Sequence, residues 1–163
     1  MGTTDLGARG NKMFSDVMKK STTCEWETPQ WLFDEYNKKY KFTLDVCSTK
    51  ENAKCKKYFT KEQNGLIQSW ENERCWMNPP YGREISKWMK KAWKESKKGT
   101  LVVCLIPSRT DTKWWHEYAQ RGDVKFIRGR LKFGNSKNSA PFPSAIVVFG
   151  GKNEPSKAKQ NRV

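Results

Sequence analysis

Several features that would place the chain in a common protein class are absent from its sequence. No apolar run approaches the roughly 20 residues needed to cross a bilayer, and residues 1–14 lack the apolar stretch of a secretory signal. The chain has one histidine, His116, and none of its five cysteines forms a C-x-x-C pair, so zinc ligands are too few. We therefore expect a soluble, cytoplasmic protein with free thiols, no metal site and no membrane partner.

Positive charge, by contrast, is in excess. Lys and Arg number 32 against 17 Asp and Glu, which gives a net charge of +15. Residues 1–20 carry a net +2 and residues 151–163 a net +3, which leaves +10 for residues 21–150. A folded body this basic favours nucleic acid as a partner over a merely soluble basic surface. We expect one domain over 21–150, between a flexible N-terminal segment and a basic, flexible tail.

The hydrophobic pattern alternates between helix-like and strand-like segments. Apolar residues of 85–98 fall on one helix face, and the apolar run 100–106 is typical of a central strand covered on both faces. Other patterns predict a helix at 29–40 with Thr28 as N-cap and Pro29 at the first position, a short helix at 51–57, and a helix at 111–120 capped by Thr110 or Asp111. They predict strands at 42–46, 58–59, 75–77, 124–127, 131–133 and 145–149. Together they predict an α/β sandwich with a mostly parallel sheet and an antiparallel far edge.

Polar residues follow three of the predicted strands. They lie at 45–48, 78–81 and 107–111, each directly after an apolar segment. In open α/β sheets, ligands bind at the carboxyl ends of the strands, so these segments should meet at one rim. Asp45 could also be a solvated residue on an edge, but it interrupts an apolar run at this rim, which favours a functional role.

The segment Asn78-Pro79-Pro80-Tyr81 suits chemistry on an amino group. An exocyclic base amine is a poor nucleophile because its lone pair is delocalised into the ring. The Asn78 side-chain oxygen and the Pro79 carbonyl can accept its two N–H groups, and consecutive prolines hold a carbonyl in place without competing donors. Tyr81 offers a flat face for a base. The alternative is a plain turn, because N-P dipeptides commonly begin turns.

The N-P-P-Y segment resembles motif IV of amino-methyltransferases, a motif shared with protein-glutamine and RNA-guanine methyltransferases. Over residues 24–149 the chain resembles the phage-type DNA N6-adenine methyltransferase (Dam) family. The likeness rests on W-E-T-P (26–29), L-D-V-C-S (44–48), N-A-K (52–54), N-G-L (64–66), W-x-x-x-x-x-W-M-N-P-P-Y-G (70–82), L-I-P-S-R-T-D-T-x-W-W (105–115) and G-R-L-x-F (129–133). This combination is more specific than N-P-P-Y alone.

The resemblance implies a Rossmann-like methyltransferase that uses S-adenosylmethionine, flips an adenine out of double-stranded DNA and works in a bacterial or phage-infected cell. Candidate cofactor residues are Trp26, Thr28, Pro29, Asp45, Cys47 and Ser48, and the catalytic residues are 78–81. The chain lacks the F-x-G-x-G loop that many methyltransferases have after the first strand; Cys47 and Ser48 stand there. Candidate phosphate contacts are Arg83, Arg109, Arg130 and Lys132, although single basic residues are often merely solvated.

Two other functions fit part of the pattern. A methyltransferase acting on an RNA base or a protein glutamine would keep N-P-P-Y, but the net charge and the L-I-P-S-R-T-D-T segment disfavour it. A catalytically silent nucleic-acid-binding module would keep the charge, but the intact N-P-P-Y disfavours it. No residue pattern reveals the target sequence or indicates an oligomer. The family name suggests G-A-T-C, and loops such as 134–143 would have to supply specificity.

Overall fold

A computed structural model describes residues 26–150, and the predicted flexible segments 1–20 and 151–163 lie outside this range. The described helices are α2 (Gln30–Tyr40), α3 (Ile85–Lys97) and α4 (Lys113–Glu117), with short 3-10 turns at Gly65–Ile67 and Ala119–Arg121. The described strands are β1 (Leu44–Asp45), β2 (Lys57–Tyr58), β3 (Arg74–Met77), β4 (Leu101–Pro107), β5 (Asp123–Phe126) and β6 (Ser144–Phe149).

These strands form one sheet in the order β2-β1-β3-β4-β6-β5. The pairs β1–β2, β1–β3 and β3–β4 are parallel, whereas β6 is antiparallel to both β4 and β5. The prediction of a mostly parallel α/β sheet with an antiparallel side is therefore confirmed. The antiparallel strand is β6, which lies inside the sheet, and β5 forms the edge.

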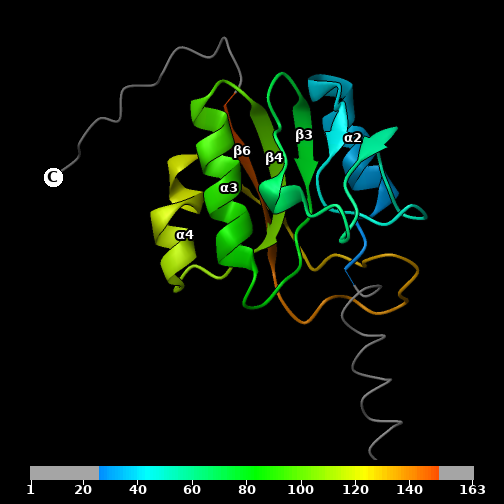
Figure 1. Cartoon of the computed structure of the whole chain (residues 1–163). Coiled ribbons are helices and arrows are strands. Elements are labelled where there is room, and N and C mark those ends of the chain that lie inside the picture. The colour runs from blue at the N-terminus through cyan, green and yellow to red at the C-terminus, as the bar shows by residue number, and fades with distance from the viewer. Residues whose placement is uncertain (1–25, 151–163) are drawn as a thin grey trace, which may run out of the picture.

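Helices cover both faces of the sheet. Successive side chains of β4 point to opposite faces, so each face presents apolar residues for a helix to pack against. Val102, Cys104 and Ile106 pack with the apolar face of α3 and with α4. Leu101, Val103 and Leu105 pack instead with α2 and with the loop between β5 and β6. Figure 1 shows α3 lying across one face of the sheet. Every residue of β4 is buried, as predicted for a central strand.

Two predicted elements are wrong. The segment predicted as a helix at 51–57 instead forms turns and bends over 51–56, and Lys57 begins β2. The side chains of Thr49 and Asn52 accept each other's backbone N–H groups, and the Lys54 N–H donates to the Asp45 carboxylate. Residues 131–133 belong to no strand. Leu131 and Phe133 are buried, which produces the alternating pattern, but they pack as part of the loop between β5 and β6.

Two predicted helix caps are also wrong. Pro29, and not Thr28, occupies the N-cap of α2, and its ring has no acceptor that could cap the helix. The Thr28 hydroxyl is used in tertiary contacts instead. Helix α4 is capped by Thr112, whose Oγ1 accepts the Trp115 N–H, rather than by Thr110 or Asp111. No helix within residues 26–150 has the length and apolar character needed to span a bilayer.

Candidate functional site

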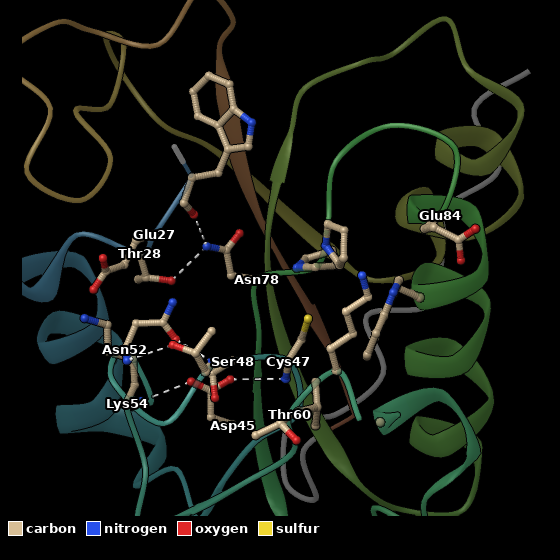
Figure 2. Close-up of a pocket in the computed structure, with 18 of the residues that line it drawn as sticks. Glu27, Thr28, Asp45, Cys47, Ser48, Asn52, Lys54, Thr60, Asn78 and Glu84 are labelled. Carbon is tan, nitrogen blue, oxygen red and sulfur yellow. Dashed lines mark hydrogen bonds between the residues drawn. The ribbon is translucent and has the colours of Figure 1, made fainter. Parts of the chain in front are cut away.

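A cavity of about 550 Å³ opens at the carboxyl ends of β1 and β3. Its walls come from the segment before α2, from the turns that follow β1 and β2, from the loop after β3 and from the start of α3. The lining residues include Trp26, Glu27, Thr28, Asp45, Val46, Cys47, Ser48, Asn52, Lys54, Thr60, Gly65, Asn78, Pro79, Pro80, Glu84 and Trp88. Figure 2 shows several of them facing a common space. The predicted rim thus brings two of its three segments, 45–48 and 78–80, to one cavity.

Asn78 is held with its amide nitrogen bonded and its oxygen free. Its Nδ2 donates to the Trp26 carbonyl at 2.6 Å and to Thr28 Oγ1 at 3.0 Å (Figure 2). Its Oδ1 is buried and has no hydrogen-bond partner among the described residues. Buried acceptors are nearly always paired, so an orphaned one at a cavity is the mark of a ligand contact. The arrangement leaves one acceptor for an incoming N–H donor.

Thr28 orients Asn78 through the sheet. The Thr28 hydroxyl accepts both the Trp76 indole N–H at 3.2 Å and the Asn78 amide N–H. Trp76 lies on β3, directly before the loop that carries Asn78, and it is fully buried. Since a hydroxyl that accepts two N–H groups is fixed in position, the amide of Asn78 cannot easily turn over.

Asp45 lies at the end of β1 and is almost fully buried. Its carboxylate accepts the backbone N–H groups of Lys54 at 3.0 Å and of Cys47 at 3.3 Å (Figure 2). Burial raises the pKa of Asp45 to about 6, and these two hydrogen bonds and the positive charge of Lys54 oppose that rise. The cavity therefore contains a carboxylate that is only partly compensated, which favours a cationic or hydrogen-bond-donating ligand.

Cys47 and Ser48 occupy the turn where a glycine-rich loop is missing. The Ser48 Oγ is buried without a hydrogen-bond partner among the described residues, so it is a second orphaned polar atom at this cavity. Burial, with the nearby Asp45 charge, raises the pKa of the Cys47 thiol to about 12. A thiol so reluctant to ionise acts as a small wall residue and not as a nucleophile. Pro29, also predicted to contact a cofactor, is buried at the start of α2 and does not line the cavity.

Tyr81 lies beside the cavity within a cluster of aromatic rings. The Trp26 indole stacks on it with 6.2 Å between ring centroids and 21° between planes, and Phe133 and Phe142 meet it edge-on. Its hydroxyl donates to the Leu105 carbonyl at 3.3 Å, and burial raises its pKa. The residue predicted as an open platform for a base is therefore covered on one face by Trp26.

The four predicted phosphate contacts are all exposed and fall into two pairs. Arg83 and Arg109 line a second pocket of about 290 Å³. Arg130 and Lys132 lie on the loop between β5 and β6, on either side of the buried Leu131. This loop is tied to the cavity wall, because the Gly134 N–H donates to the Glu27 carbonyl at 2.9 Å.

Sequence reasoning missed several residues of the cavity. Asn52 and Lys54 belong to the N-A-K segment, which supported the family resemblance but was assigned no role. Glu84 and Trp88, at the start of α3, line the opposite wall. Trp88 was read only as part of the apolar face of the helix, and Glu84 belongs to no motif that could have revealed it. No group of three or more metal-ligating side chains exists within residues 26–150.

Comparison with known proteins agrees with this geometry. The family model described as DNA N-6-adenine-methyltransferase (Dam) matches residues 15–158. A DNA N-6-adenine-methyltransferase of Haemophilus phage HP1 is 37% identical over 141 residues, which cover 80% of this chain and 81% of that protein. A DNA N-6-adenine-methyltransferase of Escherichia phage T1 is 28% identical over 145 residues, covering 72% of this chain and 60% of that protein. With its N-P-P-Y segment at the cavity and a match over most of its length, the chain belongs to the Dam family of DNA N-6-adenine-methyltransferases.

Proposed function

We propose that the protein transfers a methyl group from S-adenosylmethionine to the N6 amine of an adenine that has been flipped out of double-stranded DNA. The observation that carries the proposal is the orphaned Oδ1 of Asn78, which lies buried at the cavity while its Nδ2 is bonded to Trp26 and Thr28. An acceptor held in this way is preorganised for an N–H group that only the substrate can bring.

Asn78 and Pro79 act on the amine of the target base. The Asn78 Oδ1 accepts one N–H of the amine and the Pro79 carbonyl accepts the other, which draws the nitrogen lone pair out of conjugation with the ring. Pro79 and Pro80 both line the cavity, and their fixed backbone angles hold the loop in shape. The amine becomes acidic once methylated and releases its proton to water, so no strong base is required. Holding both reactants in one cavity supplies the rate enhancement through proximity.

The cavity fits a methyl donor of the sulfonium class. Its volume of about 550 Å³ lies within the usual range for small-molecule sites, and two buried polar atoms there, Ser48 Oγ and Asn78 Oδ1, have no partner among the described residues. When bound, S-adenosylmethionine would supply a methyl group on a positively charged sulfur. Asp45 and Ser48 would hold its polar portion, and Cys47 and Trp88 would form the apolar wall.

Tyr81 provides the stacking face for the adenine in this proposal, and Trp26 leaves that face when the base enters. The two rings are nearly parallel, so the indole of Trp26 occupies the position of a stacked base. Extrusion of a base costs a few kcal/mol, which contacts to the flipped base can offset. The basic surface holds the duplex by its phosphates, so affinity should fall steeply as salt rises.

Incubation with radiolabelled S-adenosylmethionine and separate pools of duplex DNA, RNA and protein tests the substrate. We expect label in DNA, at N6-methyladenine after nucleoside hydrolysis. Label in RNA or in protein glutamine would refute the proposed substrate, and failure to bind the donor in calorimetry would refute the proposed cofactor. Expression in a methylation-free host, followed by genome-wide mapping of modified adenines, would then identify the target sequence.

A further inference from the structure

The second pocket has a simple chemical character. Its volume is about 290 Å³, and it lies between the start of α3 and the loop after β4. Two arginines, Arg83 and Arg109, line it together with Gly82, Thr112 and apolar residues. None of the described residues that line it is acidic. Such a pocket has a positive potential and favours an anion.

Both guanidinium groups are available to a ligand. Neither makes an ion pair or hydrogen bond to any described residue, and both side chains are exposed. The backbone of Arg109 is nevertheless firmly held. Its N–H donates to the Pro107 carbonyl at 2.9 Å, and its carbonyl accepts the Thr112 hydroxyl at 2.7 Å and the Thr112 N–H at 3.2 Å. The loop thus fixes the base of the side chain without using its charge.

Gly82, which lines this pocket, directly follows the N-P-P-Y segment along the chain. The Tyr81 hydroxyl donates to the Leu105 carbonyl at 3.3 Å, which ties the loop after β3 to the end of β4. Arg83 follows Tyr81 by two residues, so their Cα atoms are at most about 7.6 Å apart. Arg109 follows Leu105 by four residues, beyond the end of the same strand. The pocket therefore adjoins the place where the proposed function positions the target base.

We propose that Arg83 and Arg109 jointly hold one phosphate of the target strand next to the flipped adenosine, an inference that rests on the proposed function. A nucleotide carries a phosphate close to its base, and a planar guanidinium binds phosphate oxygens in a bidentate manner. Two arginines on one pocket suit a single anion with several acceptor oxygens, whereas the Thr112 hydroxyl already donates its proton to the Arg109 carbonyl. Reading a guanine edge would need only one arginine, extended into a groove.

Anisotropy with a short fluorescein-labelled DNA duplex tests the site directly. The variants are Arg83→Gln, Arg109→Gln and the double variant, measured between about 50 and 200 mM salt. The double variant should lower the slope of log K against log salt by about 0.9, the value for one phosphate, which corresponds to about fivefold weaker binding at 0.15 M if both lines converge at 1 M. Each single variant should produce most of this change. Lys90→Gln/Lys94→Gln, which removes two exposed charges from α3, is the matched control and should leave methylation kinetics unchanged.

Three outcomes would overturn the proposal: an unchanged slope in the double variant, additive losses of slope that sum to about 1.8, and a loss of slope no larger than that of the control. The additive result would indicate two separate phosphates. An unchanged slope together with a changed set of methylated sites would indicate base reading. Thermal melting of each variant confirms that the fold is intact.

A neutral methylphosphonate linkage provides a second, position-specific test. It is placed in turn at each linkage flanking an adenine that the wild-type protein methylates. One position should raise the wild-type KM for DNA, and the double variant should show no further rise at that position. If the methylphosphonate at that position raises the KM of the double variant as much as it raises the KM of the wild type, other residues contact that phosphate and the proposal is refuted. If the wild-type protein methylates no DNA, the proposed function fails, while the salt slopes still test the anion site by themselves.

Discussion

Replacing Asn78 with alanine separates its role in stability from its role in chemistry. The substitution removes two hydrogen bonds of Nδ2, to the Trp26 carbonyl and to Thr28 Oγ1, each contributing about 0.5–1.5 kcal/mol. The free energy of unfolding should therefore fall by about 1–3 kcal/mol. Burial of the unpaired Oδ1 destabilises the fold, so its removal offsets part of this loss. Its removal also takes away a preorganised acceptor, which should lower kcat by about 10²–10³.

The assay is single-turnover methyl transfer to a duplex, with denaturant unfolding measured on the same protein. Thr43→Ala is the matched control, because the Thr43 hydroxyl also makes side-chain hydrogen bonds, but at the opposite end of β1. It donates to the Glu73 carboxylate and, at 3.4 Å, to the Arg74 carbonyl, and it accepts the Arg74 N–H. It should lose comparable stability while turnover stays within about twofold of wild type, since ΔΔG of folding does not enter kcat of the folded fraction. Turnover of the folded Asn78→Ala protein within a few-fold of wild type would refute the reasoning.

Three further substitutions test other parts of the site and fold. Burial raises the pKa of Asp45 to about 6, so its contribution to stability is present below about pH 4 and is lost, by up to about 3 kcal/mol, as pH rises through 6. The difference in unfolding free energy between wild type and Asp45→Asn, measured across this range, should change accordingly; a constant difference contradicts it. Thr28→Val should lower kcat without raising KM for DNA, and Thr28→Ser should restore it; a change confined to KM would exclude a positioning role. Glu95 is buried but paired with Lys91 and with the exposed Lys98, and water can solvate both ammonium groups once the carboxylate charge is gone. Glu95→Gln should therefore cost about 1–2 kcal/mol in urea unfolding at pH 7, and an unchanged free energy of unfolding would contradict this.

That residues 78–80 line a cavity could be predicted from the sequence, but the orientation of the Asn78 amide could not. An N-P-P-Y segment after an apolar strand indicates which side chain faces a ligand. Whether Asn78 presents its oxygen or its nitrogen depends on Trp26 and Thr28, which lie 52 and 50 residues away along the chain. The pattern around Thr28-Pro29 instead predicted a local helix cap. The Thr28 hydroxyl instead accepts tertiary hydrogen bonds from Trp76 and Asn78 and does not cap the helix.

The longer elements were predictable because their apolar residues repeat over several turns or across a whole strand. Helix α3 and strand β4 were predicted to within a residue or two. The short elements failed because one or two tertiary contacts outweigh so few local preferences. The turns over 51–56 are held by the Asp45 carboxylate, which accepts the Lys54 N–H. Residues 131–133 alternate in burial because a loop packs on the sheet. The covering of Tyr81 by Trp26 likewise arises from packing between distant segments.

Gly65 limits how the cavity could be re-engineered. A Cβ built on this residue would lie 2.3 Å from the Val46 carbonyl oxygen and 3.1 Å from the Trp88 ring, so two backbone segments meet there without room for a methyl group. The Trp70 indole N–H holds the Gly65 carbonyl from behind at 2.9 Å. Enlarging the cavity for bulkier donor analogues must therefore begin with a substitution that shortens a lining side chain, such as that of Trp88. Gly65 has no side chain to shorten, and any side chain added there would push against the backbone of Val46.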